Sequence, residues 1–248
     1  MPASADELYY RDQPLSQWLT AAPDGENVWQ GIGQALKATV SHLAREAQEG
    51  NGEQRLRAVR ALSSLGEQMQ WVLPALQGAL KEVALEDRDP AVREEAVGAL
   101  SQHIGPHAGQ KLSALADALK DELPAVRLGA TRALAELGAR GYPAVPGLIH
   151  VSQWDHDGAV RTHAAVAIWK IDRRDRIAVP VLMRSLREPD EVLRWVAADC
   201  LGDIGAEALD AVPDLKMALA DTYRTPLVRQ AIKLALERIE QAAQAVSA

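Results

Sequence analysis

The sequence predicts an all-α fold, a right-handed α-solenoid (an α-α superhelix) of about six to seven helical hairpins. Three observations lead to this prediction. A short motif recurs at a nearly fixed interval, each copy has the apolar spacing of an amphipathic helix, and a second helical segment lies between consecutive copies. One hairpin of this size cannot bury its apolar face alone, so we expect a continuous core between stacked hairpins.

The second residue of the motif, called the anchor below, is arginine in six of its seven copies. The copies are Val28–Val40, Gln54–Gly66, Val92–Ile104, Val126–Gly138, Val160–Asp172, Leu193–Gly205 and Val228–Glu240. The first anchor is Trp29, and the others are Arg55, Arg93, Arg127, Arg161, Arg194 and Arg229. From Arg55 onward the anchors recur after 38, 34, 34, 33 and 35 residues. Six positions past each anchor lies a small residue, and a leucine or isoleucine follows it, which gives every helix an apolar face.

Residues that begin and end helices flank these copies. The predicted N-cap residues, four positions before the anchors, are Gly25, Asn51, Asp89, Asp157, Asp190 and Thr225. Leu123 breaks the rule, and Asp121 is its expected substitute. The predicted left-handed helix ends are Gly66, Gly105, Gly138 and Gly205. Second helices are predicted to start near Leu73–Pro74, Gln110–Lys111, Val145–Pro146, Val179–Pro180 and Val212–Pro213, and no strand is predicted.

Residues 1–13 are predicted to be an N-terminal lead-in, for which disorder is one option. Residues 14–248 are predicted to form a single solenoid. Within it we expect an N-terminal cap repeat over 14–48, regular repeats over 51–240 and a tail over 241–248.

Composition narrows the classes of function. The 248 residues carry a net charge of −7, which argues against a general phosphate-binding surface and therefore against a nucleic-acid partner. No apolar run is long enough to span a membrane, and the first eleven residues lack the features of a signal peptide. The lone cysteine, Cys200, cannot form an internal disulfide and occupies the small-residue position of the motif, which favours a buried side chain over a reactive thiol. We therefore expect a cytoplasmic location.

The motif resembles the HEAT-like repeat of the short type first named after phycobilisome lyases. That repeat reads roughly D-P-x-V-R-x-x-A-x-x-A-L-x-x-I-G and is preceded by V-P-x-L. Asp89–Gly105 matches it almost fully, as do Pro124–Gly138 and Leu193–Gly205. The resemblance covers residues 50–240 well and 14–48 loosely. Tyr10–Arg11 followed by Pro14–Leu19 also resembles a lead-in found before such repeats in some bacterial proteins.

This resemblance implies a solenoid that serves as a binding scaffold rather than an enzyme. It also implies a structural ladder in which anchor arginines pair with aspartates of adjacent turns. The ladder residues are Arg93, Arg127, Arg161, Arg194 and Arg229, with Asp121, Asp155 and Asp190 as partners and Asp87 and Asp221 as further candidates.

The helix side opposite the core is the predicted binding surface, because solenoids bind partners along a concave face. Two tryptophans and several aliphatic residues lie there, and such residues are enriched where proteins bind one another. The residues predicted to contact a protein or peptide are Leu128, Thr131, Arg132, Val166, Trp169, Trp195 and Asp199. The competing interpretation, of equal weight, is that the two tryptophans complete the packing between repeats.

Other chemistry is weakly supported. The basic run Lys170, Arg173, Arg174 and Arg176, followed by Arg184 and Arg187, is better interpreted as a solvated loop than as a phosphate site. No histidine precedes a glutamate, which disfavours the HEAT-like di-iron hydroxylase of deoxyhypusine, and a metal site at His150, His156 and His163 is a minor option. No cofactor and no catalytic residue are predicted.

Two alternatives to the scaffold interpretation stay open. The resemblance also allows a bilin lyase-like or phycobilisome-associated chaperone subunit, which would bind a linear tetrapyrrole. A structural element that forms a homodimer through the same apolar face is the other alternative.

Overall fold

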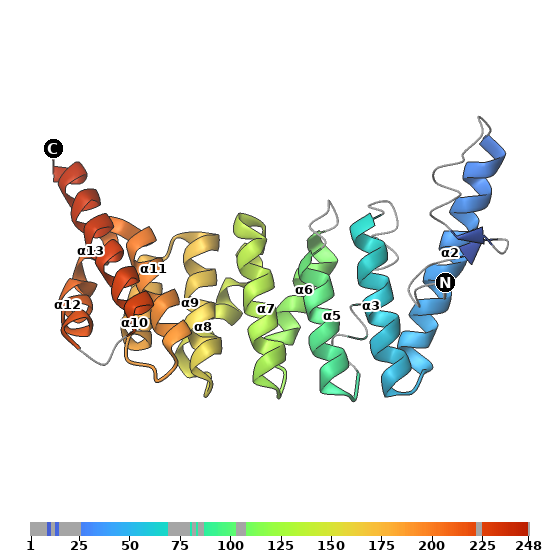
Figure 1. Cartoon of the computed structure of the whole chain (residues 1–248), viewed down its shortest axis with the longest axis horizontal. Helices are drawn as coiled ribbons and strands as arrows, with labels where there is room; N and C mark the ends of the chain where they lie inside the picture. The colour runs from blue at the N-terminus through green and yellow to red at the C-terminus, as the bar shows by residue number, and fades with distance from the viewer. Residues whose placement is uncertain are drawn as a thin grey trace. The chain divides into compact units, whose positions relative to one another are not determined.

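The computed structural model describes residues 9–10, 13–14, 26–68, 80, 83, 87–102, 108–221 and 225–247. Apart from one short pair of strands, the elements in this part of the chain are helical, as the sequence predicts (Figure 1). The chain divides into two compact units, Met1–His107 and Ala108–Ala248, which are described separately. The predicted single solenoid over 14–248 stays a prediction.

The described part of unit 1 contains three long helices that pack in sequence order. Helix α2 covers Glu26–Glu49, α3 covers Gly52–Gln68 and α5 covers Pro90–Gln102, and α3 packs against both of the others. Its buried residues include Val40, Leu62, Leu80 and Leu100. Ahead of the helices, β1 (Tyr9–Tyr10) pairs antiparallel with β2 (Gln13–Pro14), a short ladder that helical periodicity did not predict.

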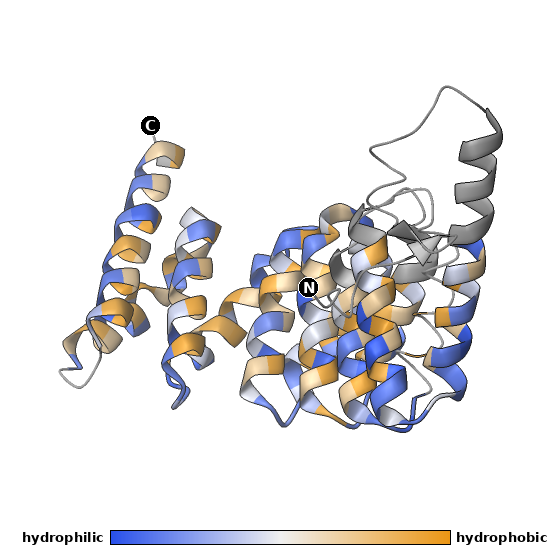
Figure 2. Cartoon of the chain, turned by 45° about the vertical axis from the view of Figure 1, so that its right-hand side comes forward, coloured by the Kyte–Doolittle hydropathy of each residue, from blue (hydrophilic) through white to orange (hydrophobic). Residues whose placement is uncertain are grey.

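Unit 2 repeats the hairpin, and each anchor helix packs against the next one along the chain. The anchor helices are α7 (Pro124–Glu136), α9 (Gly158–Asp172), α11 (Glu191–Ile204) and α13 (Pro226–Ser247). The other helices are α6 (Ala108–Ala118), α8 (Val145–Trp154), α10 (Asp175–Ser185) and α12 (Val212–Ala220). Contacts join α7 to α9, α9 to α11 and α11 to α13. Hydrophobic and hydrophilic residues alternate along α13, the helix that ends at the C-terminus in Figure 2.

Most predicted helix starts have the expected cap. Asn51 and Gln54 form a reciprocal capping box, because each side-chain oxygen accepts a hydrogen bond from the other residue's N–H. Asp157 accepts from Ala159 and Val160, whose N–H groups would otherwise lack partners. Asp89 accepts from Ala91 and Asp190 from Val192. Asp121, the expected substitute at α7, accepts from the N–H of Leu123, which lies before that helix, and Leu123 itself provides no side-chain cap.

The predicted cap at Thr225 is wrong. Its hydroxyl oxygen is buried and has no hydrogen-bond partner among the described residues. Gly25 lies outside the described residues, as does the side chain of the first anchor, Trp29.

The helix ends follow the glycine pattern only in part. Gly138 and Gly205 have φ values of +52° and +74°, and each begins a 3₁₀ segment, η2 (Gly138–Ala144) or η3 (Gly205–Ala211). Gly66 does not end its helix, because α3 continues to Gln68. Gly105 lies outside the described residues.

Helix α9 ends without a glycine. Asp172 occupies the position that Gly138 and Gly205 hold in their copies, and the left-handed conformation falls one residue later, on Arg173 (φ 53°). The Arg173 N–H donates to the carbonyl of Trp169, which closes the helix. A left-handed conformation costs a non-glycine residue on the order of 1 kcal/mol.

Of the predicted second helices, α8 and α12 start where expected and α6 starts two residues early, at Ala108. Helix α10 differs, because it starts at Asp175 and contains Pro180 rather than starting near it. The turn after α9 is so short that α10 begins directly, without the 3₁₀ segment of its neighbours. The start predicted near Leu73–Pro74 lies outside the described residues.

Candidate protein-binding surface

Each anchor arginine is the fourth residue of its helix and lies beside the turn that precedes it. In four repeats the Nη1 atom donates to the carbonyl oxygen six residues earlier. The pairs are Arg93 to Asp87 (2.7 Å), Arg127 to Asp121 (2.8 Å), Arg161 to Asp155 (2.8 Å) and Arg194 to Glu188 (2.7 Å). Each anchor therefore ties its helix to the preceding turn.

Arg55, Arg127 and Arg161 also reach forward to a carboxylate in the next turn. Arg55 binds Asp87 through Nε and Nη2 at 2.7 and 3.0 Å, and Arg127 binds Asp155 in the same bidentate way at 2.7 and 2.8 Å. Burial alone would raise the pKa of Asp155, but hydrogen bonds from Arg127 and from the backbone N–H of Asp157 lower it below its usual value. Both carboxylates are almost fully buried, so these pairs hold successive hairpins together.

The forward partner of Arg161 is not the predicted Asp190. Its Nη2 atom donates to Glu188 at 2.5 Å, whereas Asp190 caps α11. Glu188 lies six residues before the next anchor, as Asp87 and Asp155 do, and Asp190 lies at the start of α11. At the end of the series, the Nε atom of Arg194 is buried without a hydrogen bond among the described residues, and Arg229 donates to the carbonyls of Leu219 and Asp221.

The residues predicted to contact a partner differ in accessibility. Arg132 and Trp195 are exposed, while Leu128, Val166, Trp169 and Asp199 are half-buried. Thr131 cannot contact a partner, because it has 0% exposure and its hydroxyl donates to the carbonyl of Leu128. It lies four residues past the anchor, a position that the neighbouring helix covers.

The two tryptophans have different surroundings. Trp169 packs against the core cluster of unit 2, and the Arg173 guanidinium lies over its ring, 4.6 Å from the centroid. Trp195 is 38% exposed and is therefore the more accessible of the two. The competing interpretation, in which both tryptophans complete the packing between repeats, therefore holds in part for Trp169 and does not hold for Trp195.

Accessible apolar residues that the sequence analysis did not select lie beside Trp195. Val192 on α11 and Leu227 on α13 are 59% and 65% exposed, and Leu234 on α13 is also exposed. Val192 and Leu227 both lie two residues before an anchor, so reading that position in every copy would have found them. We use the name Trp surface for the accessible residues Leu128, Arg132, Val166, Trp169, Val192, Trp195, Asp199, Leu227 and Leu234.

In unit 1 the equivalent helix positions line a shallow groove. It has a volume of about 440 Å³ and is lined by Leu56, Arg60, Ser63, Ala91, Glu94, Glu95, Gly98 and Ala99 of α3 and α5. Space remains open at Gly98, where an added Cβ would meet nothing within 4 Å. Arg60 binds Glu95 across the groove at 3.2 Å.

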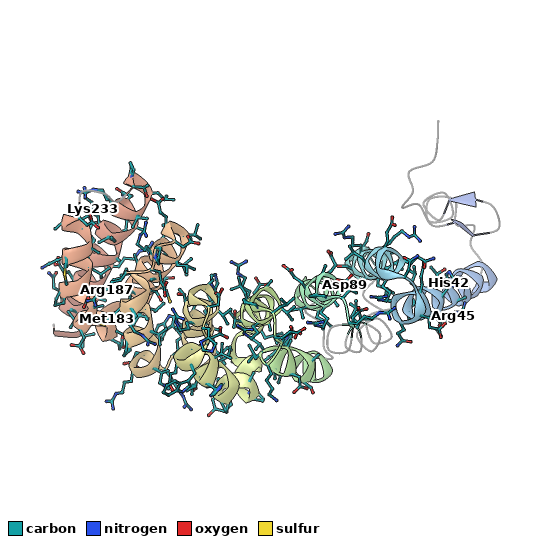
Figure 3. The ribbon with its side chains drawn as sticks, turned by 90° about the horizontal axis from the view of Figure 1, so that it is seen from below. His42, Arg45, Asp89, Met183, Arg187 and Lys233 are labelled. Carbon is teal, nitrogen blue, oxygen red and sulfur yellow. The ribbon has the colours of Figure 1, made fainter. Side chains whose placement is uncertain are left out.

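Two arginines of the predicted basic run form ion pairs among the described residues. Within the basic run, Arg174 binds Asp172. Arg187, one turn beyond Met183 of α10, binds Asp214 at 2.5 Å (Figure 3). Burial raises the pKa of the Cys200 thiol to about 12, so this thiol is not a nucleophile near neutral pH.

His163 has its Nδ1 atom 2.9 Å from the carbonyl oxygen of Ala159 and its Nε2 atom 3.3 Å from Arg132. The described residues contain no group of three or more His, Cys, Asp or Glu side chains placed to hold a metal ion. In the same part of the chain, no helix is long and apolar enough to cross a membrane.

Solved structures with the same fold are α-solenoids. An engineered protein aligns with a TM-score of 0.62 and 23% identity over 82% of this chain and 97% of its own. Computationally designed armadillo repeat proteins for modular peptide recognition align with a TM-score of 0.56 and 20% identity over 80% and 99% of the two chains. The karyopherin Kap121p, bound to the extreme C-terminus of the phosphatase Cdc14p, aligns with a TM-score of 0.65 and 15% identity over 91% of this chain and 25% of its own.

These likenesses define the class, an armadillo- or HEAT-type α-solenoid. The model of HEAT repeats matches residues 79–169 and 145–237, which together make up more than half of the chain. The chain therefore belongs to the HEAT-repeat family. No curated protein matches its sequence.

Proposed function

We propose that the protein is a non-enzymatic scaffold that binds a segment of another protein on the Trp surface. The observation that carries the proposal is the exposure of Val192 and Trp195 on α11 and of Leu227 on α13, the anchor helix that packs against it. Exposed apolar clusters on a folded chain mark interaction sites, because water solvates them poorly. Tryptophan is also among the residues that contribute most to binding energy.

The arrangement of these residues favours a segment that crosses several helices. Val192, Trp195 and Asp199 lie one above another on one face of α11, and Leu227 and Leu234 hold the same repeat positions on α13 as Val192 and Asp199 hold on α11. Neighbouring packed helices are about 10 Å apart, which an extended chain spans in about three residues. A partner segment can therefore place an apolar side chain on each helix in turn.

Two of the similar structures support this mode of binding. The designed armadillo proteins recognise peptides in a modular way, and Kap121p holds the C-terminus of another protein. We propose the same kind of partner here, a peptide-like protein segment. We also assign the repeats to the short lyase type, on the match of Asp89–Gly105 to that motif.

The test is co-purification from native lysate with the wild-type chain and two single variants, Trp195→Ala and Trp154→Ala. Trp154 is a matched control, because it is 70% exposed but lies at the end of α8, away from the Trp surface. We expect a protein that the wild type and Trp154→Ala retain and that Trp195→Ala loses. Binding of that purified protein is then measured directly.

Recovery that depends on Trp154 instead of Trp195 would refute the proposal. If the wild type had the solution mass of a dimer and Trp195→Ala had that of a monomer, the dimerising element would be favoured. Visible absorbance acquired from added linear tetrapyrrole would favour the lyase-like subunit.

A further inference from the structure

Helix α9 lies at the centre of the Trp surface, and the charges around it are predominantly positive. Lys170 and Arg173 on α9 and Arg132 on α7 form no ion pair among the described residues, although all three are exposed. Arg173 lies over the ring of Trp169 instead of over a carboxylate. These three cations thus border the apolar residues Val166 and Trp169.

The acidic side chains near α9 and α11 are largely neutralised. Asp172 binds Arg174, and Asp199 and Asp203 on α11 both bind Arg238 of α13, at 3.3 and 2.9 Å. Glu136 on α7 and Asp175 at the start of α10 form no ion pair among the described residues. Because Arg132, Lys170 and Arg173 are unpaired as well, the net charge left without a partner around α9 is positive.

The position of His163 agrees with this account. Its ring lies beside Arg132, and burial lowers its pKa, with Arg132 and Lys170 adding to the effect. The imidazole is consequently neutral at physiological pH, and it adds a hydrogen-bonding group without adding charge.

We propose that the segment bound on the Trp surface carries aspartate or glutamate side chains next to its apolar residues, and that these meet Arg132, Lys170 and Arg173. The inference rests on the proposed function and specifies the chemistry of the partner. A carboxylate at this place gains most from Arg173, which is already held by its backbone hydrogen bond and by the Trp169 ring.

A protein segment fits these cations better than a nucleic acid does. The cations that border the surface are few, and the whole chain carries a net charge of −7, which would repel a long polyanion. The exposed apolar residues Val192, Leu227 and Leu234 match side chains, not a phosphate backbone.

The experiment selects phage-displayed short random peptides on the wild-type chain, on Trp195→Ala and on the double variant Arg132→Glu, Lys170→Glu. Lys120→Glu is the matched control, because Lys120 is 81% exposed at the end of α6. Circular dichroism establishes that each variant is folded. Arg132→Gln with Lys170→Gln replaces the double reversal if that variant does not fold.

We expect wild-type peptides enriched in Asp and Glu beside aliphatic or aromatic residues. The double charge reversal should weaken the binding of these peptides about tenfold, and Lys120→Glu should leave it unchanged. Added salt should reduce the difference in affinity between the wild type and the reversed variant. Peptides that need Trp195 but show no acidic enrichment would overturn this inference and leave the proposed function standing. Peptides that bind the wild type and Trp195→Ala equally well would overturn both this inference and the proposed function. A labelled oligonucleotide that binds the wild type but not the reversed variant would show that the partner is a nucleic acid instead of an acidic peptide.

Discussion

The same repeat positions form different surfaces in the two units. One residue past the anchor, α3 and α5 of unit 1 have Leu56 and Glu94, whereas α11 of unit 2 has Trp195. Five past the anchor, unit 1 has Arg60 and Gly98, and α13 has Leu234. Unit 1 consequently has a groove crossed by an ion pair, whereas unit 2 has a surface of exposed apolar side chains.

The turns beneath these surfaces are nearly the same. Arg55 with Asp87 in unit 1 and Arg127 with Asp155 in unit 2 make the same bidentate contact. The comparison teaches that buried turn contacts keep the repeats in register and that the accessible positions are free to vary. Binding specificity can then change from one repeat to the next without loss of the fold.

Removing a turn contact should have the largest effect. Arg127→Ala leaves the Asp155 carboxylate buried without its partner, and we expect a loss of about 3 kcal/mol in the free energy of unfolding. Arg132→Ala, on the exposed face of the same helix, should change it by less than about 0.5 kcal/mol. Chemical denaturation of both variants measures the difference, and equal losses would remove the distinction between turn and surface.

The same pair predicts a dependence on pH. The pKa of Asp155 is lowered in the folded protein, so its contribution to stability is fully present above the unfolded value, about 3.9, and is lost as the pH falls through the folded value. Asp155→Asn should be less stable than the wild type at neutral pH, and the gap should shrink below about pH 4. Urea denaturation across this range tests it, and a constant gap would contradict it.

The next effect concerns binding. Trp195→Ala should weaken binding of the partner to the Trp surface by about 2 kcal/mol, which is roughly 30-fold in Kd. The same change should alter the free energy of unfolding by less than about 1 kcal/mol. Leu56→Ala alters the same repeat position in unit 1 and should leave that Kd unchanged. Titration calorimetry with the purified partner separates the two, and a similar loss in both would place the partner on both units.

Two glycines allow a smaller comparison of packing. A Cβ on Gly202 would lie 2.9 Å from the Cα atom of Ala235, so Gly202→Ala must push α11 and α13 apart. We expect a loss of about 1–2 kcal/mol. Gly98→Ala meets open space in the groove of unit 1 and should gain about 0.5–1 kcal/mol, because alanine favours the helix. Thermal unfolding compares the two variants. If Gly202→Ala were stabilised, α11 and α13 would be able to separate without loss of stability.

The smallest effect is expected at the end of α9. Arg173→Gly relieves the left-handed strain on Arg173 but removes the cation from the Trp169 ring, two terms of about 1 kcal/mol with opposite signs. The melting temperature should therefore change little. The quantity that should fall is affinity for an acidic peptide, measured by fluorescence anisotropy, and an unchanged affinity would exclude Arg173 from the binding surface.

Much of this molecule follows from local sequence. The anchor period, the caps at Asn51, Asp89 and Asp157, and the glycine ends at Gly138 and Gly205 act within a few residues, so they can be read from the chain. The family assignment rests on the same short motif.

The tertiary structure alone decided which residues remain accessible and which partners they find. Thr131 and Trp195 have equal claims to the surface on a helical wheel, yet the neighbouring helix buries Thr131 and leaves Trp195 exposed. Glu188 rather than Asp190 pairs with Arg161, because the structure places the forward partner six residues before the next anchor, where Asp87 and Asp155 also lie, and Asp190 caps α11. Spacing along one helix determines only the direction of a side chain, whereas its burial and its partners depend on the distance and angle to the next helix, which no single repeat contains.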